Sequence, residues 1–559
     1  MSRSTRANAA PAKFSGWDLL APPLAMLFPL IGFLRYHGYE LDRPEALLAL
    51  GLVGGVAAAL GALASAAPSV VRVVFYALVL LVVADVSLRL GHDDRSQLMR
   101  DWGLPVLALF VWSVVLGLMV VLSSLRAHLG LIFTAVFATM TLGVIGLPAE
   151  QKPEGVTIDT NEAAAAETRS RPDGAVVHIV LDEHIGLAGF PGEVAGAGEA
   201  ARFVRDFYLD NGFAVFGHAY SEYAQTFDSI PNLLNGIRPL SSGAGVRAVG
   251  PRYAAPHNAW FDRLARDGYT IRVYQSDYLN LCEHGGVGFC FTYSTNGAYP
   301  LRELDLPSGI KARLILGKFY KDTLAYDLAG MADAASGGVL SRALLPEPWR
   351  GGAVGEPQTG PAASMPVIDR LVGDIRAGAR GRAFFAHLIL PHFSYQFDRS
   401  CRLKGDFRTW LNRMEDWVSN TPGSRLERYQ AYLEQVRCTT LQMGRVFDAL
   451  KDAGAWENAT VIVHGDHGSR IASRTPNSAG REAFTERDWL DLHSTFIAVK
   501  RPGATPRYDT RQRSIRTIFA EQSGQNAQPD APRPEALIGD NTLTPLALPD
   551  FARFTTLAD

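Results

Sequence analysis

The sequence predicts an N-terminal α-helical membrane domain of about five spans, followed by an α/β domain with a mainly parallel sheet covered by helices on both faces. Two observations lead to this prediction. Residues 17–148 are mostly apolar, whereas the rest of the 559-residue chain has ordinary globular composition. From residue 175 onward, short β-rich segments alternate with helical ones, which is typical of βαβ units. The predicted parts are a transmembrane domain (1–148), a linker (149–174), the α/β domain (175–520) and a polar, Pro-rich C-terminal tail (521–559).

Five apolar stretches form the predicted membrane domain, each near the ~20 residues that cross about 30 Å of hydrocarbon. They are residues 17–34, 46–66, 70–90, 104–125 and 129–147. More spans follow the first stretch, so we expect it to be retained rather than cleaved as a signal peptide. An odd number of spans places the N-terminus and the α/β domain on opposite sides of the membrane. Lys and Arg do not decide the orientation, because the inner and outer segments would carry equal numbers of them.

Cysteine usage favours an exported α/β domain. All four cysteines, Cys282, Cys290, Cys401 and Cys438, follow the last span. An even number in one large domain suits two disulfides in an oxidising compartment, most simply Cys282–Cys290 and Cys401–Cys438, with buried free thiols as the alternative. We therefore expect a multi-pass protein of the inner (cytoplasmic) membrane with its α/β domain on the periplasmic or extracellular side.

The overall charge argues against a nucleic-acid partner. Lys and Arg number 54, Asp and Glu number 56, and the net charge is −2, so no basic field exists to attract a polyanion. The sequence does not indicate an oligomeric state.

Strands are predicted at 175–182, 269–277, 384–390 and 459–466, and helices at 259–267 and 425–453. Ligands gather at the carboxyl ends of strands in open α/β sheets. Three of these strands end in potential metal ligands: Asp182, Glu183 and His184; His387 and His392; and Asp466 and His467. Each alone is more often a cap or turn residue. Together they supply the Asp and His donors that a cation such as zinc requires.

The segment QTFDSIPNLLNG (225–236) reads as the start of a helix. Thr226 or Asp228 would cap it, Pro231 lies early in it and Gly236 would end it. A nucleophile at this position could use the same backbone N–H groups to hold an anion. The structural and catalytic interpretations are therefore compatible.

The segment LKDAGAWENATVIVHGDHG (450–468) resembles the helix, strand and "DHG" motif of the sulfatase-like branch of the alkaline phosphatase superfamily. The resemblance extends over roughly residues 175 to 505. Five spans before such a domain are similar in layout to membrane phosphoethanolamine transferases and lipoteichoic acid synthases. The resemblance implies an alkaline-phosphatase-like fold and a hydrolase or transferase activity.

The resemblance also implies functional residues. Its metal ligands map to Asp182, Thr226, Asp466 and His467. Glu183 competes with Asp182, because the transferases have one acid at this point and the sulfatases have two. The implied metal is Zn²⁺, with Mn²⁺ or another divalent cation as the alternative.

Two further histidines complete the implied site. His392 would lie near the substrate or a second metal and serve as a catalytic group, and His493 would complete the second site.

Spacing favours Thr226 as the nucleophile. In sulfatases a glycine follows the Cys-x-Pro-x-Arg cysteine by ten residues, and here Gly236 follows Thr226 by ten. Asp228 and Ile230 occupy the Pro and Arg positions of that motif, which argues against formylglycine chemistry. Ser229 meets only part of a serine-type sulfatase pattern.

These observations favour a metal-dependent transferase that moves a phosphoethanolamine or phosphoglycerol type of group through a phosphothreonine intermediate. A membrane lipid would be the donor, and an envelope glycan or glycolipid the acceptor. One alternative is a membrane-anchored hydrolase: a phosphodiesterase, phosphatase or sulfuric ester hydrolase. The other is a degenerate domain with a structural or sensory role.

Overall fold

The chain folds into two compact units, residues 1–152 with 306–354 and residues 153–305 with 355–559. The computed structural model describes residues 16–88, 93–146, 156–159, 172–249, 252–295, 299–302, 304–321, 358–410, 422–472 and 484–557, with a few more between 323 and 339.

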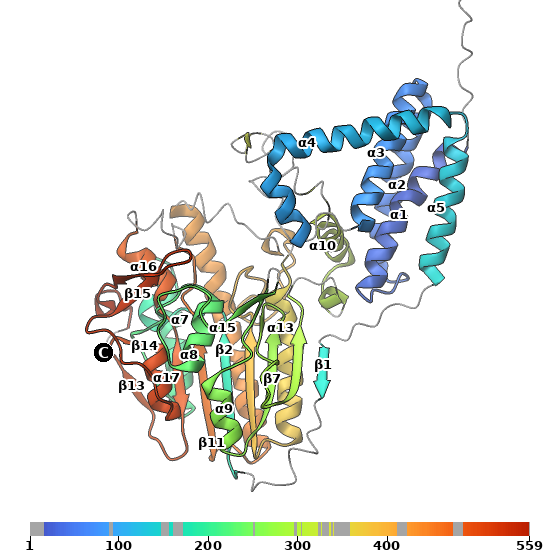
Figure 1. The fold of residues 1–559 in the computed structure, drawn as a ribbon. Coiled ribbons are helices and arrows are strands. Elements are labelled where there is room, and N and C mark those ends of the chain that lie inside the picture. Colours follow the sequence, from blue (N-terminus) through green and yellow to red (C-terminus); the bar gives the residue numbers. More distant parts are fainter. Residues whose placement is uncertain are drawn as a thin grey trace, which may run out of the picture. The chain divides into compact units, whose positions relative to one another are not determined.

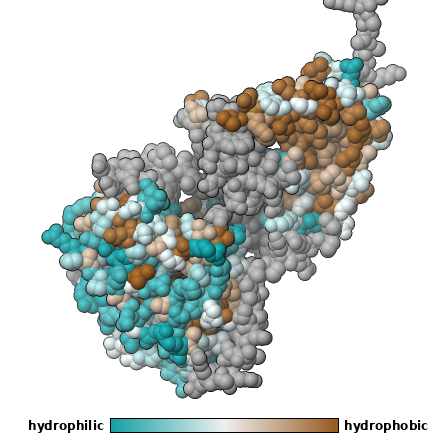
Figure 2. Space-filling model, viewed as in Figure 1, coloured by the Kyte–Doolittle hydropathy of each residue, from teal (hydrophilic) through white to brown (hydrophobic). Residues whose placement is uncertain are grey.

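The first unit consists mainly of apolar helices, which Figure 1 labels. They are α1 (Trp17–Tyr36), α2 (Pro44–Ala66), α3 (Ser69–Leu88), α4 (Asp93–Ser124) and α5 (Leu129–Gly146). Among the described residues, α1, α2, α3 and α5 are long and apolar enough to cross a membrane, and the described apolar segment of α4 is Leu109–Ser124. Figure 2 shows apolar residues on the outer surface of these helices. The five predicted spans thus coincide with five helices, four of which meet the length and apolarity of a span.

A buried polar cluster joins the helices near the start of α1. Tyr76 donates a hydrogen bond to Asp18 Oδ1 at 2.9 Å, and Arg72 Nη1 lies 3.5 Å from Asp18 Oδ2. Gly61 and Gly130 pack so closely here that an added Cβ would lie 2.8 Å and 2.5 Å from Asp18 atoms. Small residues at helix contacts allow such an approach. The cluster therefore depends on glycine in both α2 and α5.

Helix α10 (Ser308–Lys321) belongs to this first unit, although it follows strands of the second unit in the sequence. Lys311 Nζ lies 3.8 Å from Glu45 Oε1, and the rings of Phe319 and Phe33 meet edge to face at 5.5 Å. The sequence predicted this segment as part of the α/β domain. It could not reveal the contacts with α1 and α2, because partners about 270 residues apart leave no local pattern.

The second unit is built on a mainly parallel sheet. Among the described residues the strand order is β1-β9-β7-β10-β2-β11-β12-β3-β13. Neighbouring strands from β9 to β11 in this order are parallel. Strand β1 pairs antiparallel with β9, and β12 pairs antiparallel with both β11 and β3. The strands are β1 (Val156–Asp159), β2 (Ala175–Leu181), β3 (Ala214–Phe216), β7 (Thr270–Ser276), β9 (Val287–Tyr293), β10 (Arg382–Leu388), β11 (Ala459–Gly465), β12 (Ile497–Lys500) and β13 (Arg507–Asp509). The four strands predicted from the sequence are β2, β7, β10 and β11.

Helices cover both faces of this sheet (Figure 1). On one face α8 (Thr226–Asn235), α9 (Ala259–Arg266) and α17 (Ile515–Ser523) contribute Ile230, Trp260 and Phe519 to a core cluster with Val180 and Phe385. On the other face lie α13 (Gly360–Ala377) and α15 (Pro422–Asp452), with α7 (Ala197–Asp210) packed against α15. The predicted fold class is confirmed, and α9 and α15 coincide with the two predicted helices.

The predicted polar, Pro-rich tail at 521–559 contains secondary structure. Strands β15 (Glu535–Ile538) and β16 (Thr544–Ala547) form an antiparallel pair. Ala536, Ile538 and Phe551 are buried in a core cluster with Tyr220 and Leu490. The segment packs against the rest of the unit through these few apolar residues. Its average composition does not reveal them, because Pro and charged residues outnumber them.

Most of the predicted linker, 149–174, lies outside the described residues. The described part contains β1, which adds an edge strand antiparallel to β9 through pairs such as Ile158 and Cys290. The predicted linker therefore also contributes to the sheet.

Both predicted cysteine pairs are disulfide-bonded. The Cα atoms of Cys282 and Cys290 are 5.9 Å apart, and those of Cys401 and Cys438 are 4.9 Å apart. The second bond closes a loop with a sequence separation of 37 residues and ties Cys401 to α15.

We predict that loss of the Cys401–Cys438 bond destabilises the α/β unit more than loss of the Cys282–Cys290 bond. A disulfide stabilises the folded state by lowering the conformational entropy of the unfolded chain. For the separation of 37 residues this contribution to the free energy of unfolding is up to about 4 kcal/mol, and for the separation of eight residues it is about 2.5 kcal/mol. Denaturant unfolding of the paired Cys→Ser variants measures both effects. Equal stability of the Cys401→Ser, Cys438→Ser variant and the wild type would contradict the prediction.

Candidate active site

Strand register brings the predicted ligands together. β2 lies between β10 and β11, and Leu181 is level with both Leu388 and Gly465. The residues that follow these strands, including Asp182 and Asp466, therefore meet at one edge of the sheet, where open α/β sheets place their ligands.

Asp182, Asp466 and His467 form a first cluster in which one ligand atom from each residue lies within 4.8 Å of the others. All three side chains are buried. His467 Nε2 lies 3.1 Å from Asp466 Oδ2 and 3.9 Å from Asp182 Oδ1. Thr226 Oγ1 is 3.4 Å from the same His467 nitrogen. All four predicted ligands of the metal are thus brought together.

The donor atoms of this cluster fit a divalent cation. Among the described residues, Asp182 Oδ1 and Asp466 Oδ2 are buried with no hydrogen-bond partner. The other oxygen of Asp466 accepts the backbone N–H groups of Glu183 and His467, at 3.1 and 2.9 Å. His467 Nδ1 donates to the carbonyl of Gly468 at 3.0 Å, which leaves a lone pair on Nε2. Two buried carboxylate oxygens and an imidazole lone pair are the ligands that a cation such as zinc binds.

Asp182 is held in its charged form. Burial alone would raise the pKa of Asp182, but the imidazoles of His392, His387 and His467 outweigh that effect and hold this pKa below its usual range. His387 Nε2 lies 3.3 Å from Asp182 Oδ2. The sequence identified His387 as part of a pattern but not as a partner of Asp182.

Helix α8 places Thr226 at its first position. Gln225 precedes the helix in an extended conformation, and Gly236 ends it with φ of 65°. Asp228 does not cap the helix, because its carboxylate accepts Gly243 N–H at 2.6 Å and the Ser242 hydroxyl at 2.8 Å. Burial raises the pKa of Asp228.

The two hydroxyls of this first turn differ in their partners. Ser229 Oγ donates to the backbone carbonyl of Asp466 at 2.5 Å, whereas Thr226 Oγ1 faces His467 Nε2. The N–H groups of Asp228 and Ser229 donate to the carbonyl of Gln225, at 3.1 and 2.9 Å. Helix geometry leaves the N–H groups of Thr226 and Phe227 without an intrahelical acceptor, so these two could hold an anion beside Thr226.

Glu183 lies in a second cluster of possible ligands, which shares Asp182 with the first. One ligand atom each from Asp182, Glu183 and His392 lies within 4.8 Å of the others. Glu183 Oε1 is 3.5 Å from His392 Nε2 and 3.5 Å from Arg470 Nε. Burial raises the pKa of Glu183 well above its usual range, although Arg470 acts in the opposite direction. With φ of 63°, Glu183 adopts a left-handed conformation directly after the strand.

His493 lies at the C-terminal end of α16 (Glu486–His493), and it belongs to neither cluster. Its Nδ1 donates to the carbonyl of Ser221 at 2.9 Å, and its buried Nε2 has no hydrogen-bond partner among the described residues. Burial lowers the pKa of His493 to about 4, and the nearby His467 acts in the same direction. His493 is therefore a neutral, buried base close to the first cluster.

Arg470 is a site residue that the sequence reasoning missed. A lone Arg four residues after an Asp gives no signal, and its approach to Glu183 depends on the path of the loop after β11.

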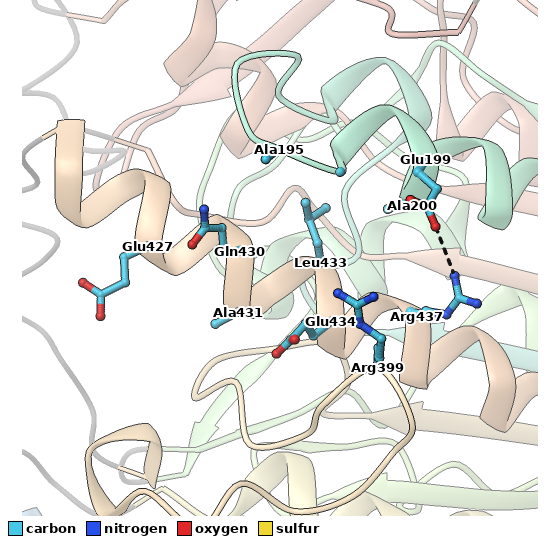
Figure 3. A pocket seen from close by; sticks show the side chains of 11 residues that line it. Ala195, Glu199, Ala200, Arg399, Glu427, Gln430, Ala431, Leu433, Glu434 and Arg437 are labelled. Atoms are coloured by element: carbon cyan, nitrogen blue, oxygen red, sulfur yellow. Dashed lines mark ion pairs between the residues drawn. The ribbon is translucent and has the colours of Figure 1, made fainter.

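A separate hollow lies between α7 and α15 (Figure 3). It is lined by charged residues of both signs, among them Arg399, Glu427 and Glu434, and Arg437 pairs with Glu199 at 3.9 Å. None of the candidate site residues lines it.

A model of the sulfatase family matches residues 207–495, more than half of the 559 residues. A comparison with curated proteins gives no match. The similar solved structures include a phosphonate monoester hydrolase of Agrobacterium radiobacter, with 14% identity over 66% of this chain and 80% of that chain and a TM-score of 0.39. They also include the C-terminal periplasmic domain of EcEptC from Escherichia coli, with 11% identity over 72% and 99% and a TM-score of 0.39.

We predict that the purified chain holds one tightly bound divalent cation, and that Asp182→Asn, Asp466→Asn and His467→Ala each lose most of it. Removing one of few ligands sharply weakens a metal site. Metal analysis of each variant after dialysis measures the effect.

Glu183→Gln is the matched control, because it changes the adjacent carboxylate and should keep the bound cation. Loss of metal from Glu183→Gln together with retention in Asp182→Asn would reverse the assignment of the first ligand.

Proposed function

On the premise that the chain belongs to the sulfatase family, and thus to the hydrolases and transferases of the alkaline phosphatase superfamily, we propose that it is a membrane-bound phospho-alcohol transferase. It would move a phosphoethanolamine or phosphoglycerol type of group from a membrane lipid to an envelope glycan or glycolipid. The observation that carries this proposal is the Thr226 hydroxyl, which lies 3.4 Å from His467 Nε2 at the start of α8.

Asp182, Asp466, His467 and Thr226 would hold the cation, which we propose to be zinc, or alternatively manganese. A bound divalent cation stabilises the deprotonated form of a weakly acidic hydroxyl and polarises a phosphoryl oxygen. The backbone N–H groups at the start of α8 would bind a second phosphoryl oxygen.

Thr226 Oγ1 would attack the phosphorus of the donor and displace the lipid alcohol. The new bond is a phosphothreonine ester, the bond from phosphorus to the lipid oxygen breaks, and the proton that Thr226 gives up passes to that leaving oxygen. The acceptor hydroxyl then attacks the same phosphorus in line, the bond from phosphorus to Thr226 Oγ1 breaks, and the proton of the acceptor hydroxyl passes to Thr226. His392 and His493 are the candidates for these proton transfers. Burial lowers the pKa of both imidazoles, which suits them to accept a proton from the acceptor hydroxyl in the second step.

Ser229 is a weaker candidate for the nucleophile. Its hydroxyl donates to the Asp466 carbonyl and also lies 3.2 Å from Ser221 Oγ. An attack by Ser229 would first have to break the contact with the segment that carries Asp466.

A membrane-anchored hydrolase is the second candidate, and the family match favours it. It would be a phosphodiesterase, phosphatase or sulfuric ester hydrolase. Water would replace the acceptor alcohol in the second step, and the same residues would act.

The orientation forms part of the proposal. Four helices suited to crossing a membrane, together with two disulfides in the α/β unit, support a multi-pass inner-membrane protein with that unit on the periplasmic or extracellular side. Alkaline phosphatase fused after residue 150 should be active. Activity of only cytoplasmic reporters at this junction would reverse the orientation.

We predict that Thr226→Ala abolishes turnover and leaves the fold intact. Thr226 is not the cap of α8, so losing its hydroxyl costs at most about 1 kcal/mol. Thr226→Ser keeps the oxygen and should retain part of the activity. With a phosphodiester substrate, the wild type should carry the phosphoryl group on the peptide that contains Thr226, detected by mass spectrometry. A label on Ser229, or full activity of Thr226→Ala, would refute the assignment.

Lipid analysis separates the transferase from the hydrolase. Thin-layer chromatography of membranes with and without the active protein should reveal diacylglycerol released from the donor together with a modified glycan or glycolipid. Release of the free head-group phosphate without a modified acceptor would favour the hydrolase.

A further inference from the structure

An aromatic surface begins directly beside the proposed nucleophile. Phe227 follows Thr226 in the first turn of α8, and its ring stacks on the ring of Tyr253, with centroids 4.3 Å apart and planes inclined by 11°. The ring of Tyr253 in turn meets that of Tyr278 edge to face at 5.5 Å. We call Phe227, Tyr253 and Tyr278 the aromatic shelf. Its three rings come from segments that are distant in the sequence.

The other end of the shelf lies at the edge of the sheet that carries the metal ligands. Tyr278 follows β7 by two residues, and β7 is parallel to its neighbour β10. At the end of β7, Ser276 Oγ lies 3.4 Å from His387 Nδ1, and the other nitrogen of His387 lies 3.3 Å from Asp182 Oδ2. Burial raises the pKa of Tyr278, and the carboxylates of Asp182 and Asp466 act in the same direction. The shelf therefore flanks both the nucleophile and the first cluster.

The shelf residues pack against the core but remain partly exposed. Tyr253 and Tyr278 lie against the core cluster that contains Ile230 and Leu279. All three shelf residues keep part of their surface open to solvent. Among the described residues, neither tyrosine hydroxyl has a hydrogen-bond partner. The shelf thus offers ring surface and two free hydroxyls to a bound molecule.

Local contacts fix the rings before any molecule binds. Strand β6 (Arg252–Ala254) pairs with β8 (Leu279–Asn280), which directly follows Tyr278. The backbone N–H of Tyr253 donates to the carbonyl of Tyr278 at 2.9 Å. A surface that is already ordered can orient a reacting hydroxyl with little further loss of entropy.

The acids that adjoin the shelf already have partners. Both oxygens of the Asp228 carboxylate accept hydrogen bonds from the loop at 242–243. Asp277, directly before Tyr278, pairs with Arg252 at 2.8 Å. Neither acid is available as the counter-charge of a cationic head group. A neutral molecule needs no counter-charge, so these contacts favour a neutral occupant.

We propose that the aromatic shelf binds one face of a sugar ring of the acceptor and thereby selects the hydroxyl that reaches the phosphothreonine. The C–H groups on one face of a pyranose ring contact the electron-rich face of an aromatic ring, and the hydroxyls at its rim hydrogen-bond to tyrosine hydroxyls. This inference rests on the proposed function, and it names the residues and the chemistry by which the acceptor is recognised.

The test uses the full chain in phosphatidylglycerol nanodiscs, whose head groups carry no cation. Saturation-transfer NMR measures two probes that require no turnover: methyl β-glucoside as a neutral sugar ring, and tetramethylammonium as a cation. We expect the wild type to saturate the ring protons of the glucoside. Tyr278→Leu keeps an apolar side chain but removes the ring, so it should bind the glucoside about two- to tenfold more weakly. Tyr278→Phe keeps the ring and should lose less affinity.

Tyr269→Leu is the matched control. Tyr269 packs against the same core cluster, but it precedes β7 and so lies at the opposite end of that strand from Tyr278. This variant should bind the glucoside like the wild type. Phe227→Leu removes the ring nearest the nucleophile and should weaken binding as Tyr278→Leu does, which keeps the test decisive if Tyr278→Leu does not fold.

Three results would each overturn the proposal. The first is a wild type that does not saturate the glucoside, with or without saturation of tetramethylammonium. The second is unchanged glucoside binding in both Phe227→Leu and Tyr278→Leu. The third is an equal loss of binding in Tyr269→Leu, which would show a general effect of the core.

Failure of this proposal can be distinguished from failure of the transferase assignment. The phosphoryl label on Thr226 forms before the acceptor reacts, so Tyr278→Leu should still carry it. A chain that is labelled but does not bind the glucoside would overturn the role of the shelf alone. A chain that binds the glucoside but never carries a label would overturn the transferase assignment alone.

Discussion

Two buried carboxylates at one edge of the sheet determine much of this architecture. Asp182 and Asp466 follow neighbouring parallel strands that end at the same level, so their charges meet in a place that water does not reach. Such a pair is stable only with positive charge close by. His467 Nε2 lies 3.1 Å from a carboxylate oxygen of Asp466, and His387 Nε2 lies 3.3 Å from one of Asp182. One oxygen of each carboxylate still has no hydrogen-bond partner among the described residues. A divalent cation satisfies this constraint and places the hydroxyl of Thr226 beside it.

A buried ion network lies behind this edge of the sheet. Behind it, the fully buried carboxylate of Asp491 pairs with Arg425 at 2.9 Å and with Arg487 at 2.8 Å. The backbone carbonyl of the same Asp491 accepts the N–H of Arg470, and His493 follows two residues later on α16. One buried ion network therefore positions both the turn after β11 and the late histidine. Removing either arginine would leave the carboxylate with less compensation, which is strongly destabilising in a buried site.

The sequence predicted the features that depend on local pattern. Hydrophobic periodicity indicated the strands β2, β7, β10 and β11 and the helices α9 and α15, and the segregation of cysteines indicated both disulfides. The convergence of Asp182 and Asp466 followed from the rule for strand ends, and Gly236 ends α8 where its type predicted. What the sequence could not reveal depends on contacts between distant residues: the docking of α10 through Lys311 on Glu45, the folded C-terminal segment, and the left-handed residues that turn Glu183 and Arg470 toward each other.

The central claim is that one divalent cation is bound by Asp182, Asp466, His467 and Thr226. Anomalous X-ray diffraction from crystals of the metal-loaded chain, recorded on both sides of the zinc absorption edge, tests this most directly. We expect a single strong anomalous peak within about 2.0–2.2 Å of oxygen or nitrogen atoms of these four side chains. A peak between Glu183 and His392 without one at the first cluster, or no bound metal in a protein that turns over substrate, would contradict it.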